Sequence, residues 1–212
     1  SSFYKDRQAN IWIIPYQNGL GLSCIQPQQQ LFRKLVLGDY IQEVLQHPTE
    51  PIIYAISYKG NLFVIDNNNQ TFTKHKVAKP IKPDDYGFYD MAFDKEGTLW
   101  ILGFEDLYFW DEKSQKIQAL QWPSWEAHRA DFGYYWDLVI DDDQHLWISS
   151  QSGGMGELDL NDQSFQLHNY DEGNPQSLTY NYSFGALYKD DLNNIWGTGD
   201  GIFYYSNEKE HF

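Results

Sequence analysis

Short apolar runs alternate with polar turn segments along the whole chain. In each repeat of this pattern an apolar run ends at an aspartate, and a short polar segment with Gly or Asn near its middle follows. A second apolar run then begins, as in Leu99-Trp100-Ile101-Leu102 after Asp94. Apolar runs of this length between turn-forming residues predict β-strands joined by hairpins. No long helical periodicity competes with them, so we expect an all-β fold.

The segment that joins the first two strands recurs with a fixed spacing between Asp and Trp. Asp94 precedes Trp100 by six residues, and Asp190 precedes Trp196 by six residues. Alignment on the tryptophan gives five units, of which the second is degenerate, with Ser57 in place of the aspartate. The anchors are Trp12, Phe63, Trp100, Trp147 and Trp196, which are 51, 37, 47 and 49 residues apart. This spacing is typical of four-stranded propeller blades.

The sequence therefore predicts an all-β β-propeller with about five four-stranded blades. The predicted blades are residues 1–38, 39–82, 83–121, 122–172 and 173–212. The last unit stops near the start of its fourth strand, so we expect a fragment of a larger, seven-bladed propeller; a closed ring of five blades is the alternative. We expect the repeated Trp to pack between neighbouring sheets and the repeated Asp to accept hydrogen bonds from its turn.

Composition and charge narrow the classes of function. Aromatic residues make up 17% of the 212 residues, which is enough for a packed core and argues against disorder. The net charge is -15, and phosphate binding needs a basic face, so we expect no nucleic-acid partner. The charge is uneven, with net +4 in residues 1–82 and net -19 in residues 83–212. The acidic part serves solubility or receives a neutral or cationic ligand.

One segment carries a resemblance to a known family. The stretch from Asn174 through Asp190 and Trp196 to Gly201 resembles the two-component regulator propeller repeat, and the resemblance covers all five units, with the second unit departing from it at both anchors. This resemblance implies a periplasmic sensor domain of a hybrid two-component system, with the histidine kinase outside this chain. It also implies recognition of an oligosaccharide, control of glycan-utilisation genes, and a parent protein that is a homodimer.

The longest departure from the repeat is the connection between the third and fourth units. It is rich in aromatic residues, which could stack on the apolar faces of sugar rings, and in polar residues that could bind sugar hydroxyls or a uronate. The alternative is a loop that buries its own aromatic residues as a satellite core. The candidate ligand-binding residues are Trp122, Trp125, His128, Arg129, Tyr134, Tyr135 and Trp136.

A second candidate site lies in the inner strands. Asp90 and Asp137 each precede the aspartate of their unit by four residues, so they occupy equivalent places; Ile53 takes that place in our alignment of the second unit. If this position faces the central channel, the two carboxylates could bind sugar hydroxyls or a cation, or act as a catalytic pair. The alternative is a polar channel lining.

Three hypotheses follow. The first is a non-enzymatic, oligosaccharide-sensing propeller segment joined to the remaining blades and domains of its parent. The second is a propeller glycoside hydrolase or lyase that uses Asp90 and Asp137. The third is a non-catalytic protein-interaction scaffold. We expect no metal or cofactor, because the six histidines lack metal-ligand spacing and the chain has no nucleotide-binding motif.

Overall fold

A computed structural model describes residues 2–15, 21–27, 31–69, 71–77, 87–104, 106–128, 134–151, 153–178, 185–199 and 201–206. It contains five antiparallel sheets, which we number as blades 1 to 5. Blade 1 contains β1 (Ser2–Lys5), β2 (Ile11–Ile14), β3 (Gly21–Gln26) and β4 (Leu31–Val36). Blade 2 contains β5 (Ile41–Gln46), β6 (Ile52–Ser57), β7 (Asn61–Asp66) and β8 (Phe72–Lys76).

The other three blades follow in chain order. Blade 3 contains β9 (Phe88–Phe93), β10 (Leu99–Gly103), β11 (Leu107–Asp111) and β12 (Lys116–Ala119). The short helix α1 (Pro123–His128) leads to blade 4, which contains β13 (Tyr135–Ile140), β14 (His145–Ser150), β15 (Met155–Asp159) and β16 (Phe165–His168). Blade 5 contains β17 (Leu187–Lys189), β18 (Ile195–Thr198) and β19 (Ile202–Tyr205).

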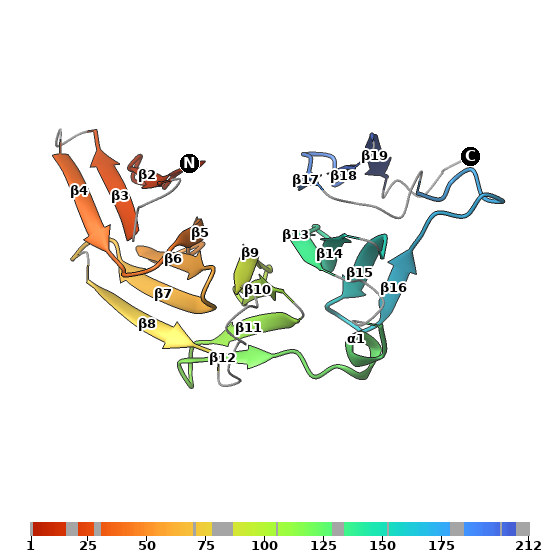
Figure 1. The fold of residues 1–212 in the computed structure, drawn as a ribbon, viewed down its shortest axis with the longest axis horizontal. Helices are drawn as coiled ribbons and strands as arrows, with labels where there is room; N and C mark the ends of the chain where they lie inside the picture. Colours follow the sequence, from red (N-terminus) through yellow and green to blue (C-terminus); the bar gives the residue numbers. More distant parts are fainter. Residues whose placement is uncertain are drawn as a thin grey trace.

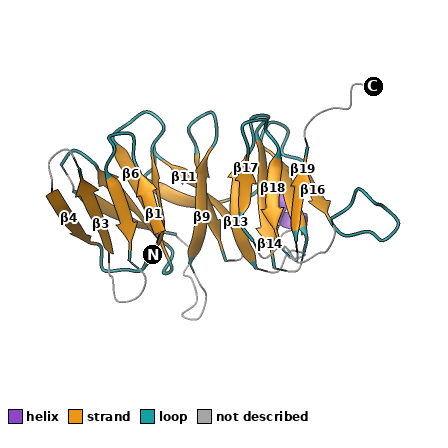
Figure 2. Ribbon diagram, turned by 90° about the horizontal axis from the view of Figure 1, so that it is seen from above, coloured by secondary structure: helices purple, strands orange, loops and turns teal. Residues whose placement is uncertain are grey.

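The sheets are arranged as the blades of a propeller, so the predicted fold is confirmed. They stand around a common axis as an arc, with β5, β9, β13 and β17 near the axis and β4, β8, β12 and β16 outside (Figure 1). In the side view the strands run roughly along that axis (Figure 2). We call the end at which the inner strands begin the proximal end, and the other end the distal end. Among the described residues, no helix is long and apolar enough to cross a membrane.

The alignment of the second unit is wrong by one strand. Ser57 and Phe63 belong to the hairpin of β6 and β7, whereas the inner strand of blade 2 is β5. In blade 1, Trp12 pairs with Tyr4, which lies two residues before Asp6. In blade 2, Tyr54 pairs with the residue that lies two positions before His47. The strand register therefore puts His47 in the Asp position and Tyr54 in the Trp position. The ring nitrogen Nδ1 of His47 accepts hydrogen bonds from turn N–H groups at 3.2 and 3.0 Å, as the aspartates do.

The repeated aspartate and tryptophan hold each first hairpin together. The indole N–H donates to the aspartate at 2.9 Å in the pair Asp6–Trp12 and at 2.8 Å in the pair Asp94–Trp100. The other carboxylate oxygen accepts the turn N–H of Asn10 in blade 1, at 2.8 Å. The expected hydrogen bonds from the turn are therefore confirmed, and the bond from the indole is an addition that satisfies a buried donor.

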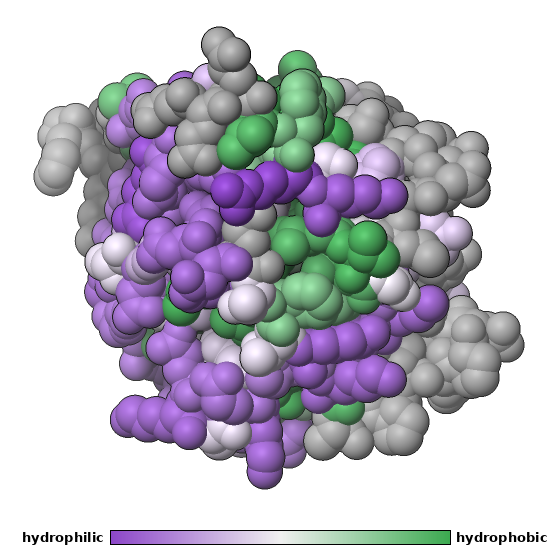
Figure 3. Space-filling model, turned by 90° about the vertical axis from the view of Figure 1, so that its left-hand side faces the viewer, coloured by the Kyte–Doolittle hydropathy of each residue, from purple (hydrophilic) through white to green (hydrophobic). Residues whose placement is uncertain are grey.

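In blades 1 to 4 the residue at the tryptophan position packs against the following blade, as expected. Trp12, Tyr54, Trp100 and Trp147 are 0%, 1%, 5% and 0% exposed, and each lies in a core cluster with residues of the next sheet. Trp196 of blade 5 is 37% exposed. Blade 1 also exposes apolar residues: Leu31, Phe32 and Val36 of β4 are exposed, and apolar side chains gather between polar ones on this side of the molecule (Figure 3).

Candidate ligand-binding site

The predicted aromatic connection is divided between core and surface. Trp125 of α1 is fully buried and donates its indole N–H to Asp106 at 3.1 Å. Tyr135 is buried beside it, with ring centroids 5.6 Å apart, and Trp122 packs on Trp100 at 5.9 Å. These three side chains are buried or partly buried as in the alternative expectation, but they join the core between blades 3 and 4 and do not form a separate satellite core. The prediction that a ligand stacks on Trp125 or Tyr135 is therefore wrong, because protein covers the faces of both rings.

Of the two polar candidates of this connection, the structure describes His128. His128 stacks on Phe165 of β16, with ring centroids 5.3 Å apart. Arg129 lies outside the described residues. A role for either residue in binding a ligand therefore remains a prediction.

Tyr134 and Trp136 point outward and join aromatic residues of two other blades. They are 46% and 41% exposed. Tyr134 stacks on Phe104 with ring centroids 4.3 Å apart, and Trp136 contacts Tyr89 at 5.8 Å. Tyr89 also lies 6.4 Å from Phe104 and 6.5 Å from Tyr58. We call these five residues, Tyr58, Tyr89, Phe104, Tyr134 and Trp136, the aromatic ridge.

The ridge lies at the proximal end and spans blades 2 to 4. Tyr58 follows β6, whose last residue pairs with the first residue of the inner strand β5. Phe104 follows β10, whose last residue pairs with the first residue of β9. Tyr89 and Trp136 lie near the starts of β9 and β13. Tyr134 and Trp136 are among the predicted ligand-binding residues, whereas Tyr58 and Phe104 follow hairpins that are distant from them in the sequence.

Bulges in the inner strands explain how the ridge forms. The register of β9 skips Tyr89 and that of β13 skips Trp136. The register of β5 skips Gln42 in the same way. A β-bulge leaves one residue unpaired and re-aims its side chain. The bulged residue of two blades is aromatic, so the ridge gains its two central members from a repeated backbone feature.

Asp90 and Asp137 lie directly after the bulged residues, and the structure adds Glu43 of blade 2 to them. Glu43 precedes His47 by four residues, so it replaces Ile53 as the equivalent of the two aspartates. Each carboxyl group reaches the inner strand of the next blade. Asp90 accepts the N–H of Leu138 at 2.7 Å, and Asp137 accepts the N–H of Leu187 at 2.6 Å. These residues therefore join the inner strands of neighbouring blades.

The three carboxyl groups follow one another along the row, and each is close enough to the next to affect its pKa, Glu43 with Asp90 and Asp90 with Asp137. Burial raises the pKa of Glu43 to about 7. Burial and the charge of Glu43 raise the pKa of Asp90 well above its usual value, and burial with the neighbouring Asp90 raises that of Asp137 to about 9. Desolvation disfavours the charged form of an acid, and like charges add to this effect.

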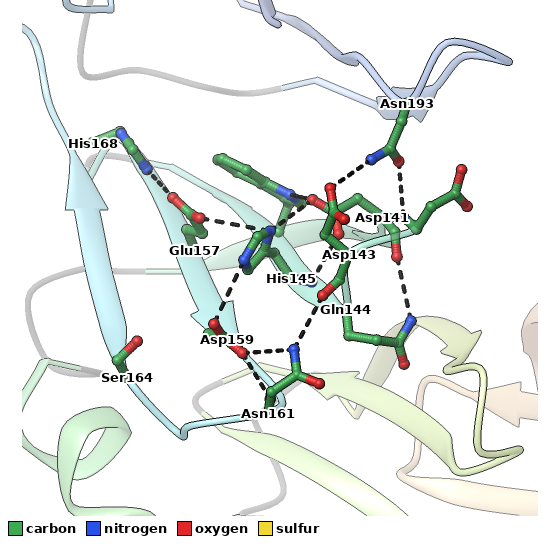
Figure 4. Close-up of polar contacts among 12 residues, drawn as sticks. Asp141, Asp143, Gln144, His145, Glu157, Asp159, Asn161, Ser164, His168 and Asn193 are labelled. Carbon is green, nitrogen blue, oxygen red and sulfur yellow. Dashed lines mark hydrogen bonds and ion pairs between the residues drawn. The ribbon is translucent and has the colours of Figure 1, made fainter. Parts of the chain in front are cut away.

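A second polar cluster, at the distal end of blade 4, was missed by sequence analysis (Figure 4). His145 lies 2.9 Å from Asp141, 3.8 Å from Glu157 and 3.6 Å from Asp159, and His168 bonds to Glu157 at 2.6 Å. Burial alone would lower the pKa of His145, but the bond to Asp141 and the neighbouring charges raise it. No group of His, Cys, Asp and Glu within the described part of the chain is suited to hold a metal ion.

The arc of radial antiparallel sheets defines a β-propeller, and solved structures of several kinds are similar to it. One kind is the extracellular domain of a protein described as the hybrid two component system BT4673 from B. thetaiotaomicron, with 19% identity, a TM-score of 0.69, and coverage of 92% of this chain and 25% of that one. The corresponding domain of BT3049 has 17% identity, a TM-score of 0.53, and coverage of 97% and 33%.

Another similar structure is an enzyme, virginiamycin B lyase from Staphylococcus aureus, with 11% identity, a TM-score of 0.70, and coverage of 98% of this chain and 70% of that one. The chain thus spans about a quarter of the BT4673 domain and about a third of the BT3049 domain. No protein-family model and no curated protein matches the sequence. At these identities the likeness concerns the fold.

Proposed function

We propose that this chain is a non-enzymatic, ligand-sensing propeller segment from the periplasmic part of a hybrid two-component sensor, and that its ligand is an oligosaccharide. The observation that carries the proposal is the aromatic ridge, where five aromatic side chains from three blades meet at one end of the propeller. The fold shared with the two extracellular sensor domains supports the class of parent protein.

The chemistry of the ridge suits a sugar chain. The rings of Tyr134 and Trp136 are partly exposed and already packed on neighbours, so they offer rigid apolar surface at low entropic cost. Tyrosine hydroxyls next to these faces can hydrogen-bond to sugar hydroxyls. Residues 83–212 carry a net charge of -19, which disfavours a polyuronide and favours a neutral oligosaccharide.

Signalling follows from the span of the ridge. A ligand that lies along it touches blades 2, 3 and 4 together, so its affinity depends on how these blades are arranged. A ligand shifts a conformational equilibrium only by its different affinity for the two states. That shift would then be transmitted to the remaining blades, to the partner subunit of a homodimer and to a kinase in the parent protein.

The experiment is titration calorimetry of the chain, and of its parent extracellular domain, against a panel of plant and host oligosaccharides, with product analysis of every mixture. Heat of binding without product supports the sensor. Heat with product moves the protein to the enzyme class. Absence of heat with every oligosaccharide rejects the proposed ligand class.

The hydrolase or lyase alternative draws on the lyase fold and on Asp90 and Asp137. The two carboxyl groups are engaged by backbone N–H groups, and Asp90 is buried, which leaves little access for a substrate. Loss of product formation in Asp137→Asn would support this alternative. The scaffold alternative draws on the exposed sheet faces of blades 1 and 5, and it predicts capture of a protein strand or sheet with no heat from any glycan.

A further inference from the structure

One backbone N–H serves two carboxyl groups at each of two blade junctions. The N–H of Met91 donates to Glu43 Oε2 at 2.9 Å and to Asp90 Oδ1 at 2.7 Å. The N–H of Leu138 donates to Asp90 Oδ2 at 2.7 Å and to Asp137 Oδ1 at 3.1 Å. Each pair of carboxyl groups therefore meets around a single donor, and the three residues form a continuous row across blades 2 to 4.

No cation offsets the charge of this row among the described contacts. The paired strands place Ile56, Leu102 and Ser149 opposite Glu43, Asp90 and Asp137, and β17 contributes the backbone N–H of Leu187. The lysines of blade 2 that form ion pairs, Lys59 and Lys74, lie 3.7 and 3.9 Å from Asp39. One N–H group cannot stabilise two adjacent anions, so neighbouring carboxyl groups in such a site share a proton.

We infer that Glu43, Asp90 and Asp137 form a proton-sharing lock between the inner strands, and that the lock sets the geometry of the aromatic ridge as a function of pH. With protons bound, carboxyl–carboxyl hydrogen bonds hold β5, β9 and β13 together. Loss of these protons to solvent leaves adjacent anions, which repel one another and loosen the junctions. Tyr89 and Trp136 directly precede Asp90 and Asp137, so loosening moves the centre of the ridge.

The lock regulates ligand binding only if the ridge binds ligand, so that consequence rests on the proposed function. The lock itself is tested without ligand, and the two can fail separately. The measurement is the thermal unfolding midpoint of the full chain between pH 6 and pH 9, for the wild type, Asp90→Asn and the control Glu96→Gln. Glu96 lies exposed in the β9–β10 turn of the same blade.

We expect the unfolding midpoint of the wild type and of Glu96→Gln to fall as pH rises. In this pH range the folded chain retains carboxyl protons that the unfolded chain has already released, so a rise in pH favours the unfolded chain. In Asp90→Asn most of this fall should disappear, because the carboxamide cannot ionise. The pH dependence that His145 contributes to stability is the same in all three proteins, so it does not affect the difference between them. An unchanged fall in Asp90→Asn would overturn the lock.

A direct titration covers the case in which Asp90→Asn does not fold. Carboxyl carbon NMR shifts of the wild type should show at least one of the three groups still protonated near pH 7, and Glu43→Gln should remove one such transition. If all three groups titrate near pH 4, the usual range for Asp and Glu, the lock does not exist.

Discussion

Asp190 accepts the indole N–H of Trp196 at 2.8 Å, although this tryptophan is 37% exposed. The corresponding bond between Asp141 and Trp147 is 3.0 Å long, and Trp147 is fully buried. The bond is thus a property of the hairpin, and burial of the indole depends on the next blade. Variants of blade 5 therefore show what the hydrogen bond and the tryptophan contribute when no following blade in the described part of the chain buries them.

Truncation of the two tryptophans should separate the effect of packing. Trp147→Ala should destabilise the chain by about 3–5 kcal/mol, because it opens a cavity between blades 4 and 5. Trp196→Ala should cost clearly less, because its face has no following sheet among the described residues. Urea unfolding measures both free energies. Equal losses would contradict the assignment of Trp147 to the blade interface.

Removal of the aspartate should also cost more stability in a buried hairpin than in the exposed hairpin of blade 5. Asp94→Ala leaves the indole N–H of Trp100 and the N–H of Thr98 without their acceptor in a buried hairpin, which should cost about 1–3 kcal/mol. Asp190→Ala should cost less, because water can reach the indole of Trp196. The readout is the shift of the urea midpoint. A larger loss in Asp190→Ala than in Asp94→Ala would argue against this role.

The histidine cluster predicts a pH-dependent stability with a defined sign. The folded-state pKa of His145 is raised, so its contribution is present in full below about pH 6.5 and is lost as pH rises through the folded pKa. His145→Asn should therefore reduce the free energy of unfolding more at pH 5.5 than at pH 8.5.

His75 serves as the opposite control for that comparison. Burial lowers its pKa, so protonation favours the unfolded chain, and His75→Asn should relieve a loss of stability at low pH. Urea unfolding of both variants at the two pH values provides the test. A His145→Asn effect that is the same at pH 5.5 and pH 8.5 would remove His145 from the pH response.

The sequence predicts the blades well because the signal is local. Asp94, its turn and Trp100 lie within one hairpin, so their spacing reports directly on the structure that they stabilise. The Asp–Trp spacing fails to locate the first hairpin of blade 2, because His47 and Tyr54 replace the two anchor residues there. The next hairpin contains Ser57 and Phe63 at the same spacing, so it was aligned in place of the first one. Glu43 was missed for this reason, since its place is counted from His47.

The candidate site was harder to predict because its parts are distant in sequence. Tyr58, Phe104 and Trp136 meet only after three blades pack side by side, and the bulges at Tyr89 and Trp136 leave no mark in the apolar pattern. Exposure was also misjudged within a single segment: Trp125 and Trp136 are both aromatic residues of one connection, but α1 places the first in the core.

The most direct test of the central claim is the affinity of the chain for the oligosaccharide that gives the largest heat in the panel, measured for the wild type, Trp136→Ala and Tyr188→Ala. Tyr188 is 63% exposed on blade 5, outside the ridge, so it controls for loss of an exposed aromatic side chain. We expect Trp136→Ala to weaken binding by about tenfold or more, equivalent to about 1.4 kcal/mol, and Tyr188→Ala to leave the affinity unchanged. Binding that survives Trp136→Ala, or that is lost in Tyr188→Ala instead, would contradict the ridge as the ligand site.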